Sequence, residues 1–171
     1  MLEQILEQLV HADRYIHKTV TAVKNLGATT AYTIGDVMSE SATVGTAWKF
    51  NFGGPGYITK AVAVSVTTGM TARLIAQCYS RPPTCNLNDE APSTGPVPAD
   101  IPFFLGTVDF PAMTDIVTGP SYTTATPSTY GNLPLEFNVP IVYVVLASLT
   151  ADDFLDGTLF YLSLSAEIEV I

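Results

Sequence analysis

Apolar residues at the start of the chain recur at alternating spacings of three and four. This is the seam of a heptad repeat, which is typical of helices that wind around one another. Gly27 follows the last of these positions and can adopt the left-handed conformation that closes a helix. The pattern predicts an N-terminal α-helix over residues 1–27, resembling a coiled-coil strand. The seam positions are Leu2, Ile5, Leu9, Ala12, Ile16, Thr19, Val23 and Leu26.

A lone helix of this length is marginal in water, so its apolar seam needs a partner surface. That partner is either a copy of the same helix or the downstream part of the same chain. We expect self-association, although the mixture of residue types along the seam matches no single rule for the number of strands. The expected oligomer interface consists of Leu2, Ile5, Leu9, Ala12, Ile16 and Val23.

The period changes from helical to alternating after Ala31, which is typical of β-strands. Tyr57–Val66 and Thr71–Ser80 flank a short turn, and we expect them to pair as a hairpin. The pattern predicts a mainly β fold in which residues 28–171 form an antiparallel two-sheet sandwich, a jelly roll. The predicted strands are Trp48–Phe52, Tyr57–Val66, Thr71–Ser80, Phe103–Phe110, Tyr122–Thr126, Leu133–Phe137, Ile141–Leu149 and Thr158–Ile171.

Residues 81–102 interrupt the strand pattern with prolines and small polar residues. Such a composition predicts a long surface loop. A loop of this length is uncommon in a compact domain and tends to be functional. We expect this Pro-rich loop to contact a neighbouring subunit.

Composition and charge narrow the functional classes. The chain is 47% hydrophobic and only 13% charged, with a formal net charge of −9. This charge would repel nucleic acid and anionic membranes, so we expect neither as a partner. No apolar run is long enough to span a bilayer, and the start lacks the pattern of a secretory signal. Cys78 and Cys85 could meet across the Pro-rich loop, but free thiols are the simpler interpretation.

Candidate catalytic or metal-binding groups are sparse. His11 and His17 are the only histidines, and on a helix they would point about 120° apart, too far for one metal ion. A Ser-His-Asp or Cys-His nucleophile in the β domain is therefore excluded. Asp152, Asp153 and Asp156 form the densest acidic cluster, which is either a solvated turn or a calcium site. We expect no enzymatic activity and no cofactor.

Four further stretches carry a resemblance to a known family. These are Ala31–Val37, Gly53–Ile58, Leu105–Phe110 and Gly131–Leu135. Together with the N-terminal heptads, they resemble head decoration or cement proteins of tailed bacteriophages. The resemblance implies a non-enzymatic virion protein, a homo-oligomer and commonly a trimer, on the capsid surface. It also implies the major capsid protein as partner and assembly in the host cytoplasm.

Two functions follow from these expectations. The first is a decoration protein that stabilises the major capsid shell by binding only its assembled state. The second is a capsid-anchored spike or head-fibre module that recognises a host-surface glycan or receptor. Exposed aromatic side chains and a calcium ion at Asp152–Asp156 would favour the second.

Overall fold

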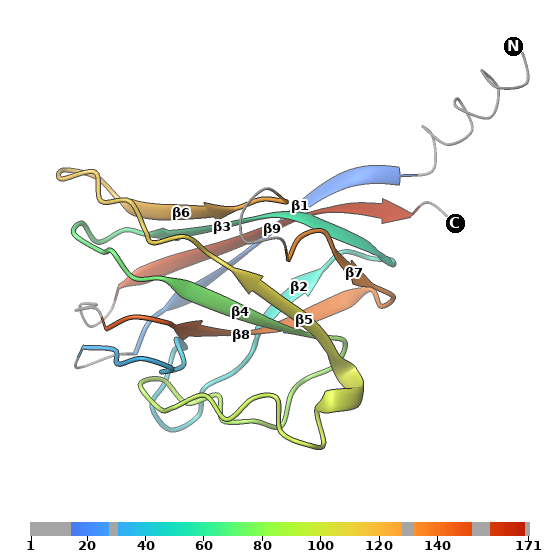
Figure 1. Ribbon diagram of the computed structural model, residues 1–171, viewed down its shortest axis with the longest axis horizontal. Coiled ribbons are helices and arrows are strands. Elements are labelled where there is room, and N and C mark those ends of the chain that lie inside the picture. Colours follow the sequence, from blue (N-terminus) through green and yellow to red (C-terminus); the bar gives the residue numbers. More distant parts are fainter. Residues whose placement is uncertain (1–14, 28–30, 128–131, 152–157, 170–171) are drawn as a thin grey trace, which may run out of the picture.

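The computed structural model describes residues 15–27, 31–127, 132–151 and 158–169, which fold as two packed antiparallel sheets (Figure 1). We call them the β1 sheet, in the order β1-β9-β3-β6 with β7 also pairing to β3, and the β2 sheet, in the order β2-β8-β4-β5. The strands are β1 Tyr15–Asn25, β2 Trp48–Asn51, β3 Gly56–Ser65, β4 Leu74–Tyr79, β5 Phe104–Asp109, β6 Ser121–Ala125, β7 Leu135–Phe137, β8 Ile141–Ser148 and β9 Leu159–Glu169.

The last two long strands insert between earlier ones. β9 lies between β1 and β3 in one sheet, and β8 lies between β2 and β4 in the other. Apart from the short β7, the eight strands of these two sheets are interleaved in the order of a jelly roll. The predicted antiparallel sandwich is thus confirmed for the β part of the chain.

The predicted N-terminal α-helix is wrong over the part of it that the structure describes. Tyr15–Asn25 is strand β1, paired residue by residue with β9 from Tyr15↔Glu169 to Asn25↔Leu159. The segment is rich in β-branched residues, and its alternation matches that of β9, so pairing in a sheet half-buries one face from Lys18 to Lys24. Residues 1–14 lie outside the described residues, and the described part contains no α-helix.

The predicted hairpin between Tyr57–Val66 and Thr71–Ser80 is also wrong. These segments form β3 and β4, which belong to different sheets. The turn between them therefore carries the chain from one layer to the other. β3 pairs with β9 and β6, whereas β4 pairs with β8 and β5. Two apolar strands joined by a turn show the same sequence pattern whether they pair in one sheet or lie in two facing sheets.

The main core lies between the two sheets. Trp48 and Phe50 on β2 are buried, as predicted for one face of that strand. The Trp48 and Phe160 rings meet edge to face, with centroids 6.2 Å apart. The largest fully buried side chains are Trp48, Tyr32, Tyr79, Phe50, Phe110, Phe137, Phe160, Leu26, Met38, Ile58, Met70 and Leu74.

The Pro-rich loop forms a third layer rather than a free excursion. It covers the outer face of the β2 sheet, at the bottom of Figure 1. A second apolar cluster lies between loop and sheet, with Tyr79 and Val145 contributed by the strands and Cys85 by the loop. Cys78 and Cys85 are both buried and free, in agreement with the simpler interpretation. The part of the β2 sheet made by β8, β4 and β5 is thereby covered on both faces.

Candidate interaction surface

The outer face of the β1 sheet is exposed, unlike that of the β2 sheet. Odd-numbered residues of β1 and β9 point outward, and their even-numbered neighbours point toward the core. Val23 is 49% exposed and Tyr122 is 41% exposed. Apolar side chains with this much exposure on one sheet face mark a candidate interaction surface.

A row of apolar side chains crosses four of the five strands of this sheet, β1, β9, β3 and β6. The pairs Val23↔Tyr161, Tyr161↔Val64 and Val64↔Tyr122 place these residues side by side. A parallel row of mostly hydroxyl side chains runs beside it, in which the Thr21 and Ser163 hydroxyls lie 2.8 Å apart. We call this surface the open face. It consists of Thr21, Val23, Val62, Val64, Val66, Tyr122, Thr124, Leu159, Tyr161 and Ser163.

The open face carries no charged side chain. Lys60 lies in the next row of β3, and the carboxylates lie at the other end of the same sheet. There His17 pairs with Glu167, and Tyr57 pairs with both Glu167 and Glu136. The negative charge of Glu136 raises the pKa of Tyr57. One end of the outer face is therefore acidic, while the open face can meet a partner without desolvating an ion.

A loop extends the open face beyond β6. Thr114 bridges to Tyr122, with backbone N···O distances of 2.7 and 3.2 Å. The loop then exposes Ile116 and Val117, the latter 82% accessible. Val117 has a φ of 37°, a left-handed conformation that is costly for a β-branched residue. A strained and exposed apolar residue beside the open face is a candidate contact.

Replacement of Val117 by Gly is expected to raise stability by about 1 kcal/mol, because Gly adopts positive φ without steric cost. Urea denaturation would measure the gain. Val44→Gly is the control, since Val44 is 75% exposed but has no positive φ. The control variant should lose a little stability. If Val117→Gly lost a similar amount, Val117 would not be strained in the wild type.

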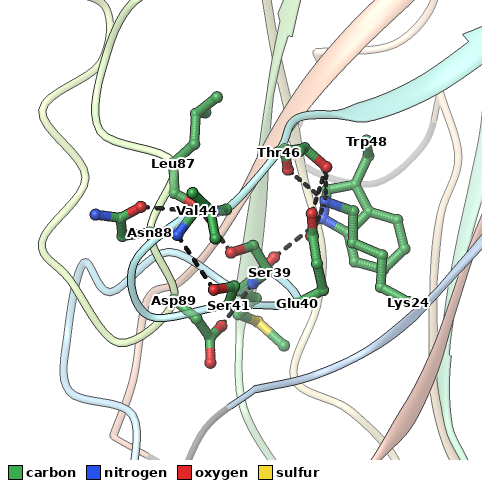
Figure 2. A network of polar contacts seen from close by, with 12 residues as sticks. Lys24, Ser39, Glu40, Ser41, Val44, Thr46, Trp48, Leu87, Asn88 and Asp89 are labelled. Carbon is green, nitrogen blue, oxygen red and sulfur yellow. Dashed lines mark hydrogen bonds and ion pairs between the residues drawn. The ribbon is translucent and has the colours of Figure 1, made fainter.

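A polar network fixes the end of β1 to the rest of the chain (Figure 2). Lys24 forms an ion pair with Glu40 and donates hydrogen bonds to the Thr46 carbonyl and hydroxyl. Its ammonium also lies 5.2 Å from the centroid of the Trp48 ring. Burial lowers the pKa of Lys24 despite the attraction of Glu40. This lysine is therefore committed to its own chain and is not available to a partner.

The same network fastens the Pro-rich loop. Ser39 Oγ donates to the Leu87 carbonyl at 2.8 Å, and the Ser39 amide donates to Asp89 Oδ1 at 2.6 Å. Tyr32 also donates to Asp89 Oδ1, at 2.6 Å. Burial raises the pKa of Asp89 to about 6. Asp89 is 2% exposed, so the junction between the two loops depends on a buried carboxyl group.

The structure separates the predicted interface residues that it describes. Ile16 points to the inner side of β1 and is 54% exposed, whereas Val23 lies on the open face. Leu2, Ile5, Leu9 and Ala12 lie outside the described residues. The role of this set in an oligomer stays a prediction.

The predicted calcium cluster Asp152, Asp153 and Asp156 also lies outside the described residues. Within the described ranges, no three His, Cys, Asp or Glu side chains gather as a metal site would require. In the same part of the chain, no helix has the length and hydropathy that a membrane span needs.

Comparisons with known proteins give distant likenesses. No protein-family model matches the sequence, and no curated protein matches it. The structure is similar to the capsid of Ralstonia phage GP4, with 13% identity, 91% of this chain and 86% of that chain covered, and a TM-score of 0.46. It is also similar to the structure of tomato aspermy virus, with 10% identity, 99% and 96% covered, and a TM-score of 0.33. At such low TM-scores and identities, these likenesses carry no weight in assigning a function.

Proposed function

We propose that this chain is a non-enzymatic virion structural protein that binds the major capsid shell of a tailed phage as a decoration or cement protein. The observation that carries the proposal is the open face, an uncharged surface on an otherwise acidic protein. The fold is compatible, because jelly rolls are common in viral capsid proteins. The sequence resemblance to phage decoration proteins points the same way.

The open face has the character of a protein interface. It combines two tyrosines with β-branched and hydroxyl side chains, and aromatic residues are enriched in the centre of interfaces. Jelly rolls also occur as lectins, but the open face lacks the charged or amide side chains that orient a sugar. The predicted helical seam is not part of the proposal, and neither is the trimer that it implied.

Replacement of Tyr122 by Glu is expected to weaken binding to capsid shells by roughly tenfold or more, because an ion would be buried at the centre of the contact. Co-sedimentation with shells assembled without this protein would measure the affinity. Asn51→Glu is the matched control, since Asn51 is exposed on the edge of the other sheet. It should bind as the wild type does.

Two results would overturn the proposal. One is a wild-type protein that does not sediment with shells at micromolar concentration. The other is equal weakening by Tyr122→Glu and Asn51→Glu, which would reflect net charge alone. Calcium-dependent glycan binding that Tyr122→Glu abolishes would favour the lectin-like alternative instead.

A further inference from the structure

Among the described residues, the longest sheet edge belongs to β1. This strand has 11 residues, whereas the other edge strands, β2, β5, β6 and β7, have four, six, five and three. Edge strands are usually short, bulged or interrupted by proline, because a long edge pairs with other chains. β1 contains no proline, and its register with β9 is unbroken over all 11 pairs. Its edge is therefore unusually well suited to pairing.

The backbone groups that face this edge can be assigned. The Leu26 amide donates to the Thr158 carbonyl, so even-numbered residues of β1 bond to β9 in the alternating ladder. On the other side of β9, the Val66 amide donates to the carbonyl of odd-numbered Leu159, as this alternation requires. The N–H and C=O groups of odd-numbered β1 residues consequently point to the free edge. These residues are Tyr15, His17, Thr19, Thr21, Val23 and Asn25.

Within the described part of the chain, no segment makes a backbone hydrogen bond to this edge. The side chains do not block it either. Lys18 donates to the Phe52 carbonyl at 2.9 Å, and Lys24 is paired with Glu40, so both ammonium groups are turned into their own chain. An inward lysine is a device that discourages edge pairing when it is free, but here each one is already held by a partner.

We propose that β1 pairs antiparallel with β1 of a second copy of this chain, about a two-fold axis that passes between the two Val20 residues. In this register Thr19 lies opposite Thr21 of the other copy, and His17 lies opposite Val23. All odd-numbered residues then fall in hydrogen-bonded pairs, and the Val20 pair is of the non-hydrogen-bonded kind. The free groups of one edge therefore meet those of the other.

The overlap of the two edges favours this register. It pairs the whole strand from Tyr15 to Asn25, with Lys18 opposite Ala22 and Lys24 opposite Ile16. A shift of two residues in either direction keeps the same backbone alternation but leaves residues at the strand ends unpaired. Paired Thr19 and Thr21 hydroxyls can also serve each other as donor and acceptor.

The proposed pairing also extends the candidate interaction surface. The two β1 sheets become one continuous sheet, and the open faces of the two copies lie on the same side of it. A partner that binds the open face would then contact two copies at once, which raises its effective affinity. The inference stands on the edge of β1 and does not require the proposed capsid partner.

Thr21→Pro tests the pairing, because Pro removes an N–H that points to the free edge and leaves the ladder to β9 intact. Sedimentation equilibrium of the purified protein should give a dimer for the wild type, about twice the 18.3 kDa of the chain. The variant should dissociate at least roughly tenfold more readily. Thr21→Ala is the matched control, since it keeps the N–H and should remain dimeric.

Crosslinking gives a second measurement that does not depend on a proline variant that folds. In the proposed register the two Val20 Cα atoms lie about 4.5 Å apart, within disulfide range. Val20→Cys should form a covalent dimer on mild oxidation. Val62→Cys should not, because β9 and β1 separate β3 from the axis and hold the two copies about 24 Å apart there.

A wild type that stays monomeric at about 100 μM would overturn the pairing, as would equal crosslinking of Val20→Cys and Val62→Cys. A dimer that Thr21→Pro leaves intact would assign the contact to another surface. Shell binding by a protein that stays monomeric would overturn the pairing and leave the proposed function standing. A dimer without shell binding would do the reverse.

Discussion

Gly45→Ala is expected to destabilise the protein by about 3 kcal/mol or more. A Cβ atom at this position would lie 1.8 Å from the Leu87 carbonyl oxygen and 2.5 Å from Ser39 Oγ. Both contacts are far inside van der Waals range, and the nearer one is to backbone. The Ser39–Leu87 hydrogen bond would have to break, and the Pro-rich layer would move away from the sandwich.

Two measurements separate this clash from a general effect of replacing glycine. Urea denaturation should show the lost stability, and Gly119→Ala should be nearly neutral because its nearest contacts would be 3.9 Å away. Cys85 reports on the layer itself. It is 6% exposed, and burial raises its pKa, so it should react slowly with a thiol reagent in the wild type and quickly in Gly45→Ala. An unreactive Cys85 in the variant would contradict the clash.

Asp89 is expected to give the protein a stability that falls as the pH rises. Its pKa is about 6 in the folded state, mainly because burial disfavours the ion, whereas 3.8 is ordinary for the free side chain. The folded state therefore holds the proton more tightly than the unfolded state between these values. By linkage, the contribution of Asp89 is fully present below about pH 4 and is lost as the pH rises toward about 7. The full loss amounts to about 3 kcal/mol, of which about 2 kcal/mol falls between about pH 4 and about pH 7.

Asp89→Asn is the variant that measures this contribution. The Asn side chain keeps an oxygen that can accept from Tyr32 and from the Ser39 amide, but it does not titrate. The free energy of unfolding, measured by urea at about pH 4 and about pH 7, should fall more in the wild type than in the variant. The difference between the two changes should be about 2 kcal/mol. Parallel pH profiles would show that Asp89 is ionised throughout.

The strands of the sandwich could be predicted because apolar and polar residues alternate along them. Trp48 and Phe50 lie on one buried face, as expected. The same signal marks the long final strand and the apolar strand before it. Alternation does not show which strands pair. The pattern of Tyr57–Val66 is compatible with pairing to β4 and equally with pairing to β9. A bulge between Ile58 and Lys60 further reverses the face, so Ile58 is in the core while Val62 is outside.

The helix prediction failed for a definable reason. Ile16, Thr19, Val23 and Leu26 fit spacings of three and four, but the same segment also alternates, with β-branched residues at Thr19, Val20 and Thr21. Local patterning cannot choose between these periods, and pairing with β9 decides in favour of the strand. The open face was missed for the same reason, since it exists only when β1, β9, β3 and β6 lie side by side. The Asp89 junction joins residues 50 apart, and no local motif marks it.

The Pro-rich layer adds no strand to either sheet, yet it covers the outer side of the sandwich over β8, β4 and β5. The two broad sides of the molecule are therefore built from separate stretches of chain. Insertions or exchanges within residues 81–102 can change what one side presents without altering the five strands of the β1 sheet that make the other. In a protein built this way, one side can keep its binding surface unchanged while the sequence of the opposite side varies.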